Sequence, residues 1–331
     1  MTCVLAKSKF HRISTNNTIL LITFFNPLKD VILVKATQSH PGKRNGLRMA
    51  YDNAHSMIVM FGGRNTLEKS LGDTWGLDSD GWKRLSSSGP TPRAWHTVVC
   101  DTARGVIILF GGRNDDEISL GDTWEWNGIE WNFVSEEGPP SRDHHAAAYD
   151  LIRKRVIVHG GYDGSKILED TWEWDGFKWH LVAEDGPLPR AAHAMAFDPY
   201  NRNTILFGGL DLTTKVFDDT WKWDGNSWSL CETAERGGRT HFSMSYDSLR
   251  KIVVQFGGKD SEMVPYGDLW RFENEKWILD AAEGPPPRID YGLEYDSVRK
   301  SVVLFGGKFP RRDGNAFDDT WVWNDRGWKQ L

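Results

Sequence analysis

The sequence has only three cysteines, Cys3, Cys100 and Cys231, among its 331 residues. An odd number cannot form an even disulfide framework, and two of the three occupy strand positions that hold larger apolar residues in other repeats. We therefore expect small core residues with no redox or metal role. This usage is compatible with a reducing compartment, so the sequence leans towards a cytoplasmic protein, with secretion as the alternative.

A long apolar run and an excess of basic residues are also missing. The N-terminal run Ile19–Phe25 follows basic residues, as in a signal peptide, but Asn-Pro-Leu-Lys comes after it instead of a small-residue cleavage site. Its seven residues are too few to span a bilayer. The net charge is −6, and the lysines and arginines are spread along the chain, which argues against nucleic acid as a partner.

Motifs of common catalytic sites are absent as well. The sequence has no glycine-rich phosphate loop, no His-Glu-x-x-His and no Gly-x-Ser-x-Gly. The segment from Asp78 to Gly81 faintly resembles the start of a calcium loop but lacks the later ligands. The sequence therefore favours binding over catalysis, and predicts no catalytic residue, cofactor or metal ligand.

What the sequence does contain is a sixfold internal repeat. Units begin at six arginines separated by 49, 49, 48, 49 and 49 residues, and six Gly-Gly pairs keep the same intervals. The units are 44–92, 93–141, 142–189, 190–238, 239–287 and 288–331. Sixteen of the 17 tryptophans fall in repeated strand positions, so we expect them mostly in the core; Trp95 is the exception.

Each unit contains four short strand patterns, named a to d in chain order. In the second unit they are HTVVC, VIILF, DTWEW and WNFV, and strands c and d are joined by Asn-Gly, a hairpin turn sequence. A four-stranded antiparallel sheet repeated about every 45–50 residues is typical of a propeller blade. The predicted fold is an all-β, six-bladed β-propeller of four-stranded antiparallel blades.

The spacing of Gly-Gly, a tryptophan pair and a further tryptophan resembles the kelch repeat. The shared pattern, R..H...YD followed by FGG and DTW.W.G..W, covers residues 44–331. It resembles free-standing kelch repeats, and no BTB domain precedes it. The resemblance implies a propeller that acts through protein–protein contact.

Residues 1–43 lack the repeat pattern and are expected to form an extension. By spacing, Ile19–Phe25 and Val31–Lys35 correspond to strands c and d, so we predict a hairpin that is the remnant of a further blade. The chain ends just after its own strand d. We therefore expect six full blades, with the ring closed by side-chain packing between the sixth and the first, and the hairpin covering that seam.

The alternating strand directions predict where ligands bind. The b–c and d–a connections open on one face, and the tight a–b and c–d turns on the other. The long, divergent connections all belong to the first face, which favours recognition there. The predicted partner contacts are Arg64, Arg113, Asn114, Asp115, Tyr162, Lys166, Lys259, Tyr266, Arg311 and Arg312.

A second candidate zone lies at the start of strand a, where the central channel is expected to open. The six repeat arginines favour a structural role, bridging neighbouring blades or loop carbonyls. Two residues later the repeat breaks, and strand alternation predicts that these variable residues share a face with the arginines. The channel-mouth candidates are Arg93, Trp95, Arg142, His144, His241 and Asp290.

Two other periodic sets are expected to be structural. His96, His145 and His193 are interpreted as packing between blades, because one histidine per blade seldom converges on a metal. The aspartate before each strand-c tryptophan is expected to accept backbone hydrogen bonds at the strand start.

The alternative function is a carbohydrate-binding or carbohydrate-active propeller, because sialidases and galactose oxidase share this architecture. A glycan or other small molecule would then be the ligand. The Ser-x-Asp-x-Gly-x-Thr-Trp box of sialidases is not matched, and the copper ligands of galactose oxidase cannot be assigned. A third interpretation, a kelch-type specifier with an iron site, lacks the Glu-x-x-x-Asp-x-x-x-His spacing of that family.

Overall fold

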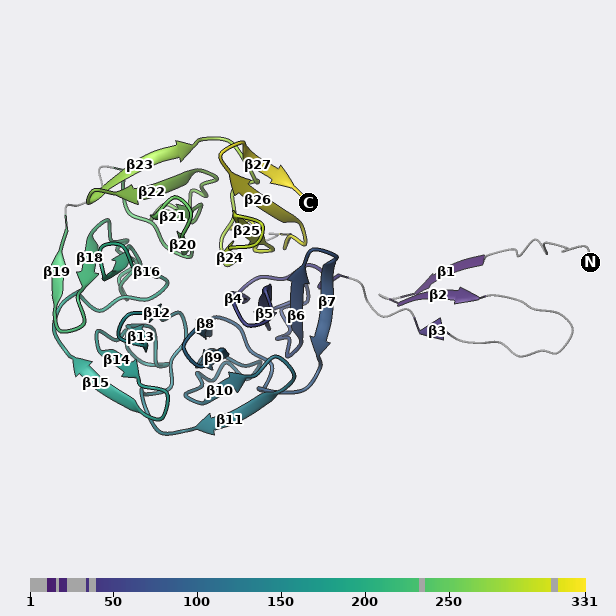
Figure 1. The fold of residues 1–331 in the computed structure, drawn as a ribbon, viewed down its shortest axis with the longest axis horizontal. Helices are drawn as coiled ribbons and strands as arrows, with labels where there is room; N and C mark the ends of the chain where they lie inside the picture. The colour runs from purple at the N-terminus through teal and green to yellow at the C-terminus, as the bar shows by residue number, and fades with distance from the viewer. Residues whose placement is uncertain (1–10, 16–17, 23–33, 36–39, 232–235, 311–314) are drawn as a thin grey trace, which may run out of the picture.

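Six four-stranded antiparallel sheets follow one another in chain order around a central axis (Figure 1). The structure is a computed structural model, and it describes residues 11–15, 18–22, 34–35, 40–231, 236–310 and 315–331. Each sheet comes from one sequence unit and keeps the order a-b-c-d from the axis outwards. The predicted six-bladed propeller is therefore confirmed.

The strands of the first three blades are β4 (Arg48–Asp52), β5 (Met57–Phe61), β6 (Thr74–Asp78) and β7 (Gly81–Ser86); β8 (Thr97–Asp101), β9 (Val106–Phe110), β10 (Thr123–Trp126) and β11 (Trp131–Ser135); and β12 (Ala146–Asp150), β13 (Arg155–His159), β14 (Thr171–Trp174) and β15 (Trp179–Ala183). Those of the last three are β16 (Ala194–Asp198), β17 (Asn203–Phe207), β18 (Thr220–Trp223) and β19 (Trp228–Leu230); β20 (Ser243–Asp247), β21 (Ile252–Phe256), β22 (Leu269–Glu273) and β23 (Lys276–Ala281); and β24 (Gly292–Asp296), β25 (Ser301–Phe305), β26 (Thr320–Asn324) and β27 (Gly327–Gln330).

The N-terminal extension forms a sheet of its own. It contains β1 (His11–Thr15), β2 (Thr18–Ile22) and β3 (Val34–Lys35), in the order β1-β2-β3. The predicted pairing of two N-terminal segments appears as the antiparallel contact of β2 with β3, and β1 was not predicted. Much of the predicted hairpin, including 23–33, lies outside the described residues. Among those that are described, no strand adds a seventh blade.

The apolar core lies between the blades. The continuous apolar strands b are buried on both faces, so Val59 and Phe61 of one blade pack with Val98 and Leu109 of the next. The strand-c tryptophans with full burial are Trp75, Trp126, Trp174 and Trp223. The strand-d tryptophans tie blades together, because the indole N–H of Trp131, for example, donates to Thr74 of the preceding blade at 2.8 Å.

The interpretation of His96, His145 and His193 as packing residues agrees with the structure. All three are buried. The His145 ring lies edge-on against Phe110 of the preceding blade, and its Nε2 lies 2.9 Å from the hydroxyl of Thr97 there. These histidines are spread around the ring and do not converge.

The ring closes with the same contacts that join the other blades. Val303 and Phe305 of the sixth blade share a core with Trp82 of the first, and Trp82 donates to Thr320 at 3.0 Å. Backbone bonds also cross this seam, including Gly307 N to Arg44 O at 2.9 Å. The expected closure by side-chain packing is thus joined by main-chain hydrogen bonds, since backbone groups at the inner end of each blade reach its neighbour. Within the described chain, no helix is long and apolar enough to cross a membrane.

Candidate binding site at the channel mouth

Six residues, one from each blade, surround the axis where strand a begins. These inner-ring residues are Gly46, Trp95, His144, Ala192, His241 and Asp290. Each has a positive φ between 52° and 67°. Each backbone N–H donates to the carbonyl of the ring residue in the preceding blade, at 2.7–3.1 Å, and Gly46 to Asp290 completes the circle. A closed hydrogen-bonded ring therefore fixes these six backbones at the channel mouth.

The positive φ corrects the predicted position of the arginines. In an extended strand residues two apart share a face, but the left-handed residue breaks that alternation. Arg93 and Arg142, predicted at the channel mouth, are fully buried inside their own blades. Arg93 Nη1 donates to Gly111 O at 2.9 Å, so the expected contact with a loop carbonyl is correct. Its side chain bridges positions within one blade.

The partner of each arginine is the aspartate before the strand-c tryptophan. Arg93 donates to both carboxylate oxygens of Asp122, at 2.5 and 2.7 Å, and Trp124 Nε1 donates to the same carboxylate at 2.7 Å. The prediction that these aspartates accept backbone hydrogen bonds was incomplete, because their main partners are side chains. The pairs recur in all six blades. These pairs are therefore a structural repeat. The residues that differ between blades at the channel mouth are those of the inner ring.

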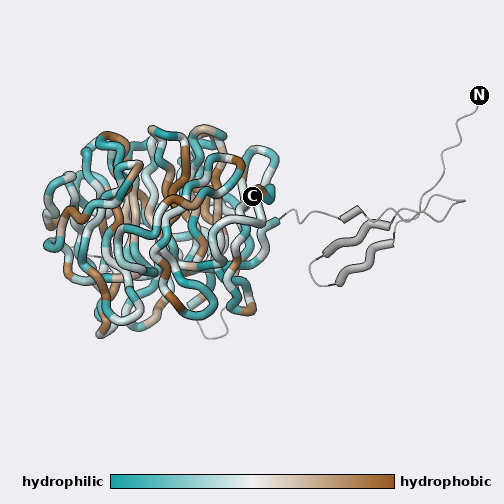
Figure 2. The backbone as a smooth tube through the Cα atoms, turned by 90° about the horizontal axis from the view of Figure 1, so that it is seen from below, coloured by the Kyte–Doolittle hydropathy of each residue, from teal (hydrophilic) through white to brown (hydrophobic). Residues whose placement is uncertain are grey.

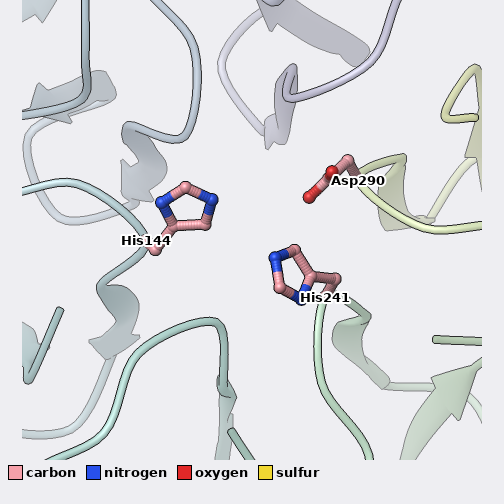
Figure 3. A group of neighbouring side chains, drawn as sticks. All are labelled: His144, His241 and Asp290. Atoms are coloured by element: carbon pink, nitrogen blue, oxygen red, sulfur yellow. The ribbon is translucent and has the colours of Figure 1, made fainter. Parts of the chain in front are cut away.

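Three inner-ring side chains converge on one space near the axis (Figure 3). His144, His241 and Asp290 come from the third, fifth and sixth blades, and their nearest ligand-type atoms lie within 4.8 Å of one another. Burial lowers the pKa of His241 to about 3, so its imidazole is neutral. Burial alone would raise the pKa of Asp290, but neighbours including His241, His144 and Lys308 outweigh it and hold that pKa below its ordinary value.

Trp95 supports this cluster from the second blade. Its indole stacks on the His144 ring with centroids 4.6 Å apart, and the guanidinium of Arg64 lies 4.5 Å from its centroid. Trp95 is only 8% exposed, so little of its ring is left for a sugar. Trp95 therefore fits a role in positioning His144.

The channel beyond the inner ring opens on the side of the tight turns. It has a cavity volume of about 550 Å³ and is lined by the six strands a and by a–b turn residues such as Asn53 and Val298. Glu294 of β24 stands in its wall, and burial raises the pKa of its carboxyl to about 8. The inner ring thus separates this cavity from the loops on the opposite face.

The divergent b–c connections form what we call the loop rim, residues 64–72, 113–121, 162–169, 210–218, 259–267 and 308–318. The first predicted contact, Arg64, is 8% exposed and donates to Glu117 at 2.6 Å, so it links two loops beneath the surface. Arg113 pairs with Glu117 at 3.0 Å. The Asn114 side chain accepts two N–H groups of its own loop, and Asp115 accepts one from Ser70. These four residues therefore hold the first two loops in shape.

The remaining predicted contacts differ in exposure. Lys166 is exposed, whereas Tyr162 is half-buried and donates to Gly164. Lys259 is half-buried near Asp290, and Tyr266 donates to Asp260 while its ring lies against Arg239. Arg311 and Arg312 lie outside the described residues.

Sequence reasoning found the members of the inner cluster but not the cluster itself. His144, His241 and Asp290 are each separated by about one or two repeat lengths, so no local spacing joins them. The only signal was the break in the repeat at equivalent positions. Their meeting depends on left-handed backbones that turn those side chains to a common axis.

Comparison with known proteins agrees with the repeat and the fold. A family model described as the KLHDC2/KLHL20/DRC7 Kelch-repeats domain matches residues 77–235. A solved structure entitled "Structure of YjhT" superposes with a TM-score of 0.69 and 15% identity, covering 88% of this chain and 99% of that one. No curated protein matches the sequence. With six in-register repeats folded into six blades, the chain is a six-bladed β-propeller, and the match over residues 77–235 supports kelch repeats.

Proposed function

We propose that the protein is a non-catalytic binding scaffold that presents the loop rim to a protein partner. Kelch propellers commonly act as protein-interaction scaffolds. The proposal depends on a similar hydrogen-bonded loop frame in the first five blades, with different side chains at each tip. A rigid frame with variable tips suits recognition, because little conformational entropy is lost on binding.

In the first five loops, the shared backbone is built by the second residue after the Gly-Gly pair. Asn65, Asn114, Asp163, Asp211 and Asp260 each use one side-chain oxygen to accept two or more N–H groups from the following residues. An isolated bridge then closes each loop, as between Arg64 and Ser70. These bonds fix the tips before any partner arrives.

The tips themselves differ in chemistry. Leu67 is 79% exposed, Ile118 56%, Leu212 63% and Met263 51%, whereas the third loop carries Gly164 and Ser165. The tight-turn face has exposed apolar residues too, including Ile129 and Phe177, and hydrophobic segments are visible on both faces in the side view (Figure 2). Exposure alone therefore does not select a face, and the choice depends on the variable, pre-organised tips.

The test compares matched variants of the two faces. Leu67→Ser, Ile118→Ser and Leu212→Ser are combined in one protein, and Ile129→Ser with Phe177→Ser in the control. We expect the first variant to lose partner recovery at least about tenfold in co-purification from the native cell, since a few buried anchors dominate binding. The control should recover the partner normally, and both should keep the thermal midpoint. Loss confined to the control, or cross-links concentrated on the tight turns, would show that the assigned face is wrong.

A further inference from the structure

Two histidines and one aspartate of the inner ring have the composition of a transition-metal site. His144 and His241 each turn one ring nitrogen, and Asp290 its carboxylate, into the same space near the axis (Figure 3). Between these ligands the ring carries Ala192 on one side, and Gly46 and Trp95 on the other, where Trp95 stacks on His144. The geometry points to a site for one divalent first-row transition metal of the zinc class, held by His144, His241 and Asp290.

The supporting contacts orient His144 as a ligand. Its Nδ1 lies 2.5 Å from Asp143 Oδ1, and Asp143 is fully buried and accepts a second hydrogen bond from Ser119 at 2.7 Å. Asp143 thus acts as acceptor for the His144 Nδ1–H, and the lone pair of Nε2 is left for a metal. A carboxylate behind a ligating histidine is the common outer-shell arrangement at zinc sites.

The neighbours of His241 are compatible with the same tautomer. The Thr240 hydroxyl lies 3.3 Å from Ala192 O and 3.1 Å from His241 Nδ1. When this hydroxyl donates to Ala192 O, its oxygen accepts the His241 Nδ1–H. Nε2 of His241 is then also unprotonated and free to bind a metal.

Asp290 supplies an independent observation. It is only 5% exposed, yet its carboxylate accepts no hydrogen bond from any residue that the structure describes. Nor does Asp290 belong to any of the ion pairs formed by those residues, although Lys259, Lys308 and Arg48 are near enough to act on it electrostatically. A buried carboxylate without a direct partner is unfavourable unless it is paired or coordinates a metal. A bound cation would satisfy it.

The donor set selects the class of metal. Two imidazoles disfavour calcium and magnesium, which prefer oxygen ligands, and suit zinc, iron, cobalt or nickel. In a tetrahedral zinc site with bonds of about 2.0–2.1 Å the ligand atoms lie about 3.3 Å apart, so the separations of up to 4.8 Å must close by about 1.5 Å. Because Asp143 and Trp95 hold His144, metal binding requires His241 and Asp290 to move towards it. Three protein ligands leave a fourth position, and Lys259 and Lys308 favour an anionic group there.

The experiment uses the full-length protein treated with a chelator and desalted, with Zn²⁺ or Co²⁺ added as chlorides. We expect one equivalent of either metal to remain after desalting, and Co²⁺ to give the intense visible absorption of a four- or five-coordinate site. Asp290→Asn and His241→Asn should each weaken Zn²⁺ binding at least about 100-fold. Asp143→Asn, which alters only the support of His144, should weaken it about 10–100-fold.

His180→Asn is the matched control, because His180 is a half-exposed histidine paired with Asp175 at 2.8 Å outside the cluster. It should bind Zn²⁺ as the unchanged protein does. Circular dichroism checks the fold of each variant without metal, and His144→Asn replaces any variant that fails to fold. Retention of well under one equivalent by the unchanged protein would overturn the proposal. Undiminished binding in the folded cluster variants would also overturn it.

Discussion

Arg93 illustrates how a repeated residue can look functional and be structural. Its side chain is fully buried, and both of its terminal nitrogens donate to Asp122. Burial alone would raise the pKa of Asp122, but the hydrogen bonds and charge of Arg93 outweigh it and hold that pKa below its ordinary value. The pair therefore stabilises the fold above the ordinary aspartate pKa, and its contribution is lost as the pH falls through that range.

Replacing Arg93 by methionine should destabilise the propeller by about 3–5 kcal/mol at neutral pH, because it leaves the partly buried Asp122 without its cation. The double variant Arg93→Met with Asp122→Asn should recover part of that loss. Urea unfolding at several pH values measures both effects. The difference in unfolding free energy between the unchanged protein and Arg93→Met should narrow as the pH falls below about 4 and through the lowered pKa of Asp122, where the pair's contribution is lost. If this difference in unfolding free energy stayed constant down to about pH 3, lost packing, and not charge, would be the cause of the instability.

A second residue-scale feature is the one break in the tryptophan–threonine ladder. The strand-d tryptophans of the first five blades each donate to a strand-c threonine of the preceding blade. At the equivalent position of the fifth blade stands Leu269, and the indole N–H of Trp328 accordingly has no acceptor among the described residues. Here one sequence difference accounts directly for one missing hydrogen bond between blades.

At the scale of the element, the Gly-Gly pair ends strand b and turns the chain into the loop rim. Gly111 has φ +65°, and a Cβ atom there would lie 2.6 Å from the carbonyl oxygen of Arg142. That carbonyl also accepts the N–H of Gly112 at 2.9 Å, which joins neighbouring blades. The pair is therefore required both for the turn and for the close approach of the next blade.

Gly111→Ala should therefore lower the free energy of unfolding by more than the replacement of a turn glycine usually does. Gly164 is the matched control, because it also has a positive φ, +99°, and a Cβ atom there would meet open space within 4 Å. Gly164→Ala should cost about 1–2 kcal/mol from its backbone conformation alone. Gly111→Ala adds the collision with Arg142 O and should exceed that value clearly in chemical denaturation. If the two substitutions lowered the free energy of unfolding equally, this would show that the blades can separate slightly without penalty.

At the scale of the whole molecule, the contacts that close the ring come from residues from His40 onwards. The first and sixth blades meet through a shared core, the Trp82–Thr320 bond and the Gly46–Asp290 backbone bond. His40 also packs against Phe305, with ring centroids 5.7 Å apart. These contacts involve none of residues 1–39, so the ring has what it needs to close without them.

Deletion of residues 1–39 should therefore leave a folded propeller whose thermal midpoint changes by only a few degrees. Deletion of residues 1–92, which removes the first blade, should expose two unpaired blade faces and give aggregation. Circular dichroism melting and size-exclusion chromatography distinguish these outcomes. A large loss of stability in the shorter deletion would mean that the extension does cover the seam, as the sequence pattern predicts.

Much of the fold was predictable because the same sequence pattern recurs in every blade. Six copies of strand pattern, Gly-Gly and tryptophan spacing specify four strands per unit, and β8, β9, β10 and β11 lie within one residue of the predicted segments. The candidate site was only partly predictable. The positions that differ between blades could be found, but the alternation rule misplaced Arg93 and Arg142, since it assumes extended backbone where the structure has positive φ.

The sequence by itself determined the number of blades, their strand order and the face that carries the variable loops, because these follow from periodicity and strand direction. Only the tertiary structure decided which side chains meet. His144, His241 and Asp290 are far apart in the chain, and they come together because a closed ring of hydrogen bonds brings six left-handed residues to one axis. Closure is a property of all six blades at once, so no single repeat could encode it.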